Sequence, residues 1–263
     1  MSSYFKTIKN HTEQWCDFFL DLIFPIECIN CGEEKIWLCE KCFKTIDLNS
    51  ESLCPACDRK TFSSQYCIYC QENFSLNGIF VASNYENKII KASIKNLKYH
   101  LIKDLSLPLA KLLSLYFLGL SEKIKKLPSD NPDAIINYDL AKNLFSDLEN
   151  ILIIPIPLHP RRLRWRGFNQ AELIAEHFAN NLNFKIDKKN LIRKKFRTPQ
   201  AKLNKKDRID NIKNCFSWQG GNINQKIILI DDIATTGSTL NECAKILKQN
   251  GAEQVWGLVV AKN

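Results

Sequence analysis

Apolar residues are grouped along this chain in two ways, which predict different elements. Short continuous apolar runs are typical of buried strands, and they lie at residues 78–85, 151–157, 227–231 and 255–261. Apolar residues spaced three and four apart predict helices at residues 1–27, 87–97, 105–118, 168–182 and 238–251. Because strands alternate with helices, the pattern predicts an α/β fold with a parallel sheet flanked by helices.

Three connecting segments are too polar for either pattern. Residues 119–135 contain two prolines and are predicted to form a loop, within an insertion at 121–150 whose role stays open. Residues 158–167 are predicted to be a basic loop, and a polar, basic segment continues to about residue 214. The resulting organisation is an N-terminal helix at 1–27, a cysteine-rich module at 28–75 and an α/β domain at 76–263.

The cysteines change the interpretation of the module at 28–75. Eight of the eleven form four Cys-x-x-Cys pairs, namely Cys28/Cys31, Cys39/Cys42, Cys54/Cys57 and Cys67/Cys70. Each pair places two thiolates on one tight turn, and two such turns complete a tetrahedral sulfur shell that suits Zn²⁺. The eight ligands therefore predict two structural zinc sites. Pairing in sequence order needs the least chain crossing, but an interleaved pairing stays open.

Charge and hydropathy restrict the partners of the protein. The net charge is +9, and residues 155–215 hold 16 Lys and Arg against 5 Asp and Glu, a net +11. Such a basic block suggests an anionic partner, either a phosphorylated small ligand or nucleic acid. Asp17 and Asp21 interrupt the apolar N-terminal segment, so no signal peptide and no membrane span are predicted. We expect a cytoplasmic protein.

The strand at 227–231 leads into the most informative motif. Asp231 and Asp232 come at its carboxyl end, where ligands of parallel sheets bind. They precede a turn into the next helix made of Ala234, Thr235, Thr236, Gly237, Ser238 and Thr239. Small residues at a helix N-terminus let backbone N–H groups approach a phosphate. Adjacent carboxylates suit the two hydroxyls of a ribose, so the motif predicts a ribose 5-phosphate site.

This motif resembles the phosphoribosyl pyrophosphate (PRPP) motif of type I phosphoribosyltransferases. Further matches are similar to the ComF family of competence-associated proteins, from about Asp21 to the C-terminus. They are Ile154-Pro155-Ile156-Pro157-Leu158, Arg166-Gly167-Phe168-Asn169-Gln170, Lys98-Tyr99, the later residues Arg193, Gln200, Arg208, Asn211 and Phe216, and the double zinc ribbon. The resemblance implies a type I phosphoribosyltransferase-like domain in a bacterial cytosolic protein for natural transformation, with a helicase-like partner. The insertion at 121–150 is the part it explains least.

The resemblance also implies roles for the residues near the site. Asp231 and Asp232 would bind the ribose hydroxyls, and residues 234–239 the 5-phosphate. Pro157, Leu158 and His159 would form the pyrophosphate loop, and residues 161–168 part of a mobile cover. Arg166 would stabilise the departing pyrophosphate, with Mg²⁺ bridging diphosphate and ribose.

The same basic segment fits single-stranded DNA. Cations that follow a backbone, mixed with aromatic rings that stack on bases, are typical of single-strand binding. The candidate contacts are Arg161, Arg162, Arg164, Trp165, Arg193, Lys194, Lys195 and Arg197, with Phe168 and Phe196 among them. Phe168 and Phe196 also suit packing into the core.

Two functions therefore stay open. The first is a competence protein that binds PRPP, or another phosphoribosyl group, and single-stranded DNA. The alternative is a metabolic PRPP-dependent transferase acting on an amine or a base. The motif at 231–239 fits both, and no acceptor pocket is recognisable from the sequence.

Overall fold

The computed structural model describes residues 25–61, 64–126, 138–194 and 214–262. Its contacts divide the chain into two compact units, residues 1–46 and 47–263. The helix predicted at 1–27 lies almost wholly outside the described residues. In the first unit, an antiparallel bridge joins Glu27 to Glu34, and the helix α2 (Glu40–Lys44) begins after Cys39.

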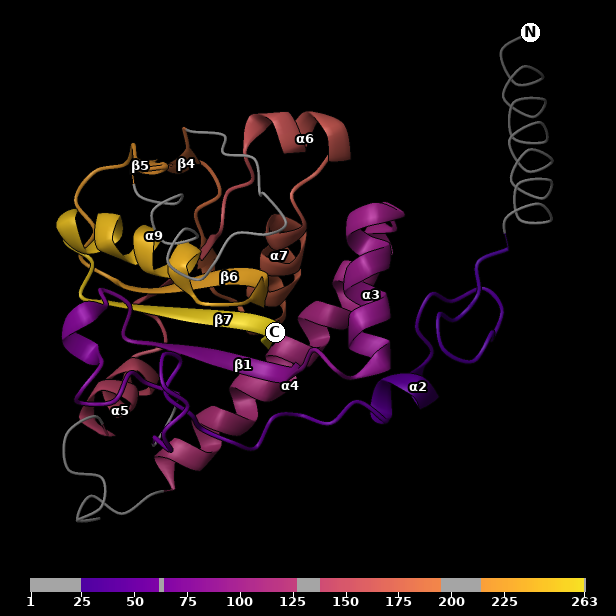
Figure 1. The fold of residues 1–263 in the computed structure, drawn as a ribbon, viewed down its shortest axis with the longest axis horizontal. Coiled ribbons are helices and arrows are strands. Elements are labelled where there is room, and N and C mark those ends of the chain that lie inside the picture. Colours follow the sequence, from indigo (N-terminus) through magenta and orange to yellow (C-terminus); the bar gives the residue numbers. More distant parts are fainter. Residues whose placement is uncertain (1–24, 62–63, 127–137, 195–213, 263) are drawn as a thin grey trace, which may run out of the picture. The chain divides into compact units, whose positions relative to one another are not determined.

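A parallel five-stranded sheet forms the centre of the second unit (Figure 1). Its spatial order is β1 (Gly78–Asn84), β7 (Gln254–Lys262), β6 (Lys226–Ala234), β2 (Ile151–Pro155) and β3 (Lys185–Ile186). All neighbouring strands are parallel, with Ile228 of β6 opposite both Ile153 of β2 and Trp256 of β7. This confirms the predicted phosphoribosyltransferase-like α/β class and the four longer strands. The two-residue β3 was not predicted.

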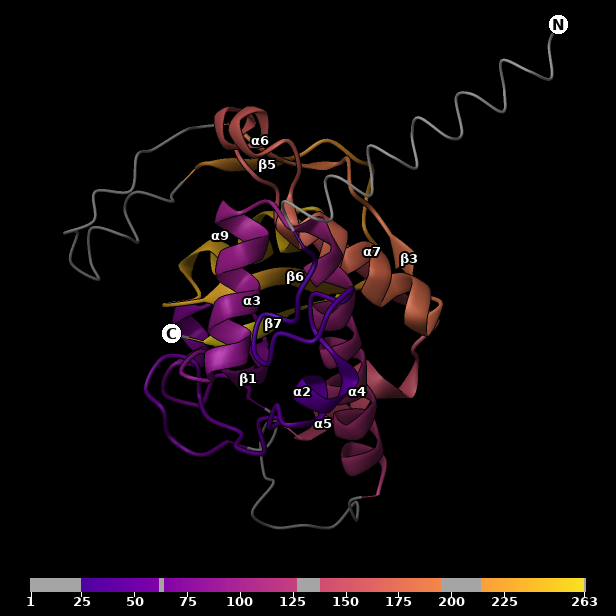
Figure 2. The same cartoon turned by 90° about the vertical axis from the view of Figure 1, so that its right-hand side faces the viewer.

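Helices cover both faces of this sheet. They are α3 (Lys88–Tyr99), α4 (Ser106–Lys125), α5 (Tyr138–Ser146), α7 (Gln170–Leu182) and α9 (Ser238–Gln249). Figure 2 shows α9 on one side of the sheet, and α4 and α7 on the other. Single 3₁₀ turns lie at Gln71–Asn73 (η1) and Lys103–Leu105 (η2).

Alternate strand residues build two separate cores. Ile79, Leu229 and Val259 pack with Leu240 and Leu247 of α9 on one face. On the other face, Phe80 stacks on Trp256 at 4.9 Å between ring centroids, and Phe145 of α5 joins Phe80 to Phe117 of α4. The continuous apolar character of β1, β6 and β7 follows from burial on both faces.

Helix α4 is long and apolar. Among the described residues, one helical stretch, Lys103–Lys125, meets the length and hydropathy expected of a membrane span, with 56% of its most apolar window buried. Phe117 meets Phe178 of α7 edge to face at 5.6 Å, and Asn181 donates to the Ser114 hydroxyl at 3.2 Å. The inner side of α4 therefore belongs to the core of the α/β unit.

Two expectations about the connecting segments were wrong. The loop predicted from residue 119 begins later, because α4 continues to Lys125 with Ser121 and Ile124 buried. The charged residues in the last turns of α4 lie on its exposed side, and because of them the sequence pattern did not indicate that the helix continues. The insertion at 121–150 also contains α5, although residues 127–137 of that insertion lie outside the described chain.

The predicted basic loop is largely a helix, α6 (Pro160–Arg166). Pro160 occupies its first turn, where a missing N–H costs nothing, and the His159 ring accepts a hydrogen bond from the Arg161 N–H at 3.1 Å. Gly167 ends the helix with φ +78°. The polar segment up to residue 214 also holds β4 (Leu191–Arg193), which pairs antiparallel with β5 (Phe216–Trp218).

Candidate functional site

Four cysteines of the first unit converge on one point. The sulfur atoms of Cys28, Cys31, Cys39 and Cys42 all lie within 4.8 Å of one another. Burial opposes ionisation of Cys28, but backbone N–H donors, first among them that of Cys39, lower its pKa to about 6. A thiolate is therefore available at neutral pH. This Cys₄ set is a structural zinc site.

A second Cys₄ set lies in the α/β unit. The sulfur atoms of Cys54, Cys57, Cys67 and Cys70 also lie within 4.8 Å of one another. Cys57 and Cys31 are the exposed members of their clusters. The predicted pairing in sequence order is confirmed, and the interleaved alternative is wrong. Each set uses the turn of the Cys-x-x-Cys pair to bring its two sulfurs to the same ion.

The two acids of the motif lie at the carboxyl end of β6 in different environments. Asp232 is 2% exposed and forms an ion pair with Lys98, at the end of α3. Its other oxygen accepts from the Gln170 side chain at 3.2 Å. Asp231 is half-buried, and its carboxylate accepts the backbone N–H of Asp232 at 2.9 Å. Asp232 is thus fixed inside the protein, while Asp231 is the acid with access to solvent.

The pKa values of Asp231 and Lys98 both depend on the charge of Asp232. Burial and the neighbouring charge of Asp232 raise the pKa of Asp231 well above its usual range, although Lys98 opposes the shift. Burial works against the charge on Lys98, but Asp232 outweighs it and the pKa of Lys98 lies above its ordinary value. Asp231 therefore holds a proton more readily than an ordinary aspartate.

The turn after β6 has the geometry expected of a close backbone approach. Gly237 has φ +71°, and a Cβ atom added there would lie 2.7 Å from the Ile79 side chain. The hydroxyls of Thr236 and Ser238 are 2.6 Å apart, and α9 begins at Ser238. Four hydroxyl residues and a glycine thus lie at the N-terminus of a twelve-residue helix, shortly after Asp231 in the chain.

Arg166 joins α6 to the acids. It is 8% exposed and donates to the Gln170 side chain, which in turn donates to Asp232. Burial lowers the pKa of Arg166, and the nearby Asp232 carboxylate opposes that shift. A buried chain therefore runs from Arg166 through Gln170 and Asp232 to Lys98. The prediction that Arg166 lies at this site is consistent with the geometry.

Four other arginines of the basic segment lie close enough to His159 to affect its protonation. Its slight burial lowers its pKa, as do the positive charges of Arg193, Arg164, Arg162 and Arg161. The predicted pyrophosphate loop, at Pro157 to His159, thus lies in a strongly positive region directly after β2. An anion is the ligand that this potential favours.

The aromatic residues of the basic segment differ in exposure. Trp165 is 64% exposed and lies 5.9 Å from the Arg166 guanidinium, measured to the ring centroid. Phe168 is 7% exposed and packs below Lys103. Trp165 therefore presents a ring to solvent, whereas Phe168 is a core residue. Phe196, Lys195 and Arg197 lie outside the described residues.

Arg193 is the last residue of the strand β4, and Lys194 follows it. The Arg193 guanidinium lies over the Phe216 ring, 5.3 Å from the ring centroid. Burial is the largest cause that lowers the pKa of Arg193, and the negative charge of Asp231 opposes this shift. Arg193 is therefore partly buried, with its guanidinium over the Phe216 ring. Lys194 is exposed. The sequence grouped these two cations as equivalent DNA contacts, but the fold gives them different surroundings.

Comparisons with known proteins agree with this arrangement. A family model described as a double zinc ribbon domain matches residues 19–71. The chain is 27% identical over 221 residues to "Competence protein ComFC" of Streptococcus pneumoniae, covering 83% of this chain and 84% of that protein. It is 40% identical over 114 residues to "Competence protein F" of Haemophilus influenzae, covering 41% of this chain and 50% of the relative.

These similarities, with the double zinc ribbon, support assignment of the chain to the ComF family. A further relative, "DNA utilization protein YhgH" of Escherichia coli K12, is 35% identical over 108 residues, which cover 40% of this chain and 48% of that protein. The chain thus spans about half the length of the Haemophilus and Escherichia relatives, and most of the length of the Streptococcus ComFC.

Proposed function

We propose that this ComF-family protein serves natural transformation or DNA utilisation in the cytoplasm by binding a phosphoribosyl ligand, PRPP with Mg²⁺, and single-stranded DNA. The observation that carries the proposal is the position of Asp231. Asp231 lies near the carboxyl end of β6 in a parallel sheet, and β6 ends three residues later at Ala234, where the small-residue turn into α9 begins.

The turn supports binding of the 5-phosphate. Residues 235–239 place backbone N–H groups at the start of α9, where the helix dipole favours an anion. Gly237 lets the turn lie directly against Ile79, because it carries no side chain on that inner side. Asp231, which precedes the turn on β6 and is only half-buried, would accept a ribose hydroxyl. Asp232 contributes by holding the Lys98 and Gln170 side chains in place at the end of β6.

The region around His159 supports binding of the pyrophosphate. Arg161, Arg162 and Arg164 lie on α6, and Arg193 approaches from β4, so the cations come from two elements. Mg²⁺ bound with PRPP would reduce the charge of the diphosphate. Asp231 supplies a carboxylate oxygen of the type that Mg²⁺ prefers.

The exposed side of α6 supports binding of single-stranded DNA. Arg161 and Arg164 are exposed there with Trp165, giving phosphate-binding cations beside a ring for base stacking. The names of the relatives, which refer to competence and to DNA utilisation, support a role with DNA. A helicase-like protein of the same system is the partner that this role suggests.

Ligand fragments provide the test of this proposal. Ribose 5-phosphate should occupy the turn, and pyrophosphate the region around His159, so each should raise the melting temperature less than PRPP with Mg²⁺. Fluorescence anisotropy of a labelled single strand, with and without PRPP, tests the DNA half separately. If neither fragment nor PRPP shifts the melting temperature, the phosphoribosyl half of the proposal is wrong.

Transfer of the phosphoribosyl group to an amine or a base is a second candidate function. The cations around His159 favour it, because they could stabilise charge on departing pyrophosphate. Release of pyrophosphate from PRPP in the presence of candidate acceptors tests it. No release with any amine or nucleobase, from protein that binds PRPP, would favour a binding role.

A further inference from the structure

The side chain of Asn241 connects the second zinc module, which holds Cys54, Cys57, Cys67 and Cys70, to the candidate phosphate-binding turn at residues 235–239. This residue lies in the first turns of α9, and its Oδ1 accepts from the N–H groups of Ser75 (2.8 Å) and Leu76 (3.1 Å). Its own N–H donates to the carbonyl of Gly237 at 2.9 Å. One residue thus joins the segment that follows the zinc ligand Cys70 to the turn at Gly237.

Packing makes a second connection between the same two parts. Tyr66, next to the zinc ligand Cys67, is 1% exposed and stacks on Phe74 with ring centroids 4.1 Å apart. A Cβ atom added to Gly237 would lie 3.4 Å from the Tyr66 hydroxyl and 2.7 Å from Ile79. The turn therefore rests against the zinc module on its inner side.

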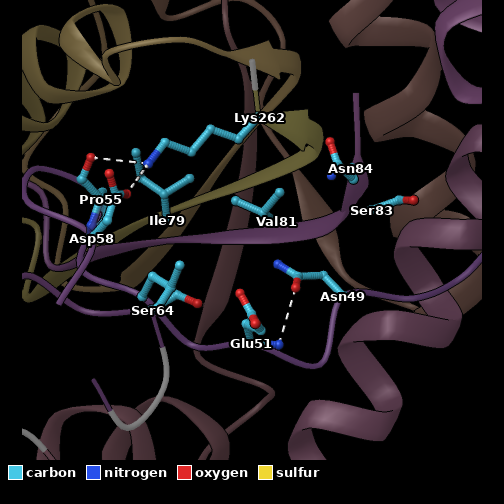
Figure 3. Close-up of a pocket in the computed structure, with 11 residues that line it drawn as sticks. Asn49, Glu51, Pro55, Asp58, Ser64, Ile79, Val81, Ser83, Asn84 and Lys262 are labelled. Atoms are coloured by element: carbon cyan, nitrogen blue, oxygen red, sulfur yellow. Dashed lines mark hydrogen bonds and ion pairs between the residues drawn. The ribbon is translucent and has the colours of Figure 1, made fainter. Parts of the chain in front are cut away.

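The zinc module is also tied to the sheet. The Ile79 N–H donates to the Ser64 carbonyl at 3.0 Å, so the segment before Tyr66 extends the edge of β1. At the other end of the sheet, Lys262 reaches Asp58 at 3.0 Å and the Pro55 carbonyl at 3.4 Å (Figure 3). These contacts place the second Cys₄ cluster within the framework that holds β1, β7 and α9 together.

From these contacts we infer that the second zinc site positions the phosphate-binding turn, with Asn241 and Tyr66 as positioning residues, and that the first zinc site does not. The first cluster lies in the other compact unit. Loss of zinc from the second cluster frees the segment 66–76, and the turn at Gly237 loses its support. Zinc and phosphoribosyl ligand are then linked, so each strengthens binding of the other. The ligand half of this inference rests on the proposed function.

Two matched substitutions of zinc-ligating cysteines test the inference. Cys57→Ala and Cys31→Ala each remove the exposed cysteine of one cluster. Hydrogen exchange, measured by mass spectrometry on the full chain without ligand, follows the amides of Ser75, Leu76 and Asn241. We expect faster exchange there in Cys57→Ala and wild-type exchange in Cys31→Ala. Equal exchange in both variants, fast or slow, would overturn the inference.

Substitutions at Asn241 test the connection with both zinc sites intact. Asn241→Leu removes the acceptor, whereas Asn241→Asp keeps it. We expect fast exchange at Ser75 and Leu76 in Asn241→Leu, and wild-type exchange in Asn241→Asp. Wild-type exchange in Asn241→Leu would show that Asn241 does not make the connection.

Ligand binding gives the final comparison. We expect Cys57→Ala and Asn241→Leu to weaken PRPP binding by about 5- to 150-fold, the range of coupling between linked sites, and Cys31→Ala to bind as wild type does. Unchanged affinity in Cys57→Ala would overturn the linkage. If wild-type protein binds no PRPP, the proposed function is wrong, and the exchange measurements still decide whether zinc supports the turn.

Discussion

Lys98, at the end of α3, forms an ion pair with Asp232, whose side chain is 3% exposed at the end of β6. The pair connects two segments separated by more than half of the chain. It also changes how the acidic pair of the motif is understood. Asp232 acts mainly on its protein neighbours, and Asp231 is the acid available to a ligand. An experiment that substitutes both acids together would mix ligand binding with folding.

The first prediction concerns the stability of this ion pair. Lys98→Met leaves the Asp232 carboxylate buried without its cation, and loss of one partner of a buried pair costs about 3 kcal/mol. Urea unfolding measures the change. The control is Lys126→Met, which breaks an exposed pair with Glu122 and should change stability little. Equal effects of the two substitutions would contradict the assigned burial.

The second prediction concerns pH. The folded state raises the pKa of Asp231, so the folded chain holds this proton more tightly than the unfolded chain does. Ionised Asp231 therefore costs stability at pH 7, and the cost disappears as the pH falls toward about 4. We expect Asp231→Asn to raise the melting temperature at pH 7, with a smaller gain at lower pH.

Asp187 provides the opposite case. Burial opposes its ionisation, but hydrogen bonds from Asn190 and Lys189 outweigh it and lower its pKa. Its contribution is present at neutral pH and is lost as the pH falls through that lowered pKa. Asp187→Asn should lower the melting temperature at pH 7. If both variants shift stability in the same direction at pH 7, the assignment for Asp231 is wrong.

The third prediction concerns the turn. Gly237→Ala places a side chain at φ +71° and into Ile79, so we expect a loss of at least about 1 kcal/mol in unfolding free energy and no PRPP binding. Gly119→Ala is the control, because Gly119 lies exposed in α4 with open space around it. It should stabilise by about 0.5–1 kcal/mol. Tight PRPP binding by Gly237→Ala would exclude this turn as the phosphate site.

The fourth prediction concerns DNA. If Arg161 and Arg164 each contact a phosphate, replacing both with Gln should reduce the salt slope of single-strand binding by about 1.4, because each contact contributes about 0.7. Replacing Lys123 and Lys125, also basic residues on a helix, should leave the slope unchanged. Anisotropy titrations between low and moderate salt measure it. An unchanged slope in the arginine variant would remove α6 from the DNA surface.

Sequence alone could predict the long strands, α3, α7 and α9, because each has continuous or regularly spaced apolar residues. The zinc ligands were equally clear, since four identical spacings indicate the chemistry, but the pairing of the turns stayed open until the structure grouped the sulfur atoms. Helix α6 also had a signal, with Pro160 at its start and Gly167 at its end. The density of arginines, which suggested a flexible basic loop, hid it.

Contacts between distant segments had no such signal. Lys98 was known only as part of a family resemblance, and no spacing indicates that it meets Asp232. The connection through Asn241 depends on backbone N–H groups at Ser75 and Leu76, whose direction is set by the fold. Likewise, alternation along β6 could predict that Asp231 and Asp232 point apart, but not which one is buried.

The central claim is that Asp231 and the adjacent turn bind a phosphoribosyl ligand. Calorimetric titration of PRPP with Mg²⁺ into wild-type protein and into Asp231→Ala tests it most directly, because this single substitution leaves the Lys98–Asp232 pair intact. We predict saturable binding to wild type and binding at least about tenfold weaker, a loss of about 1.4 kcal/mol, in the variant. Equal binding by both proteins, or none by wild type, would contradict the account.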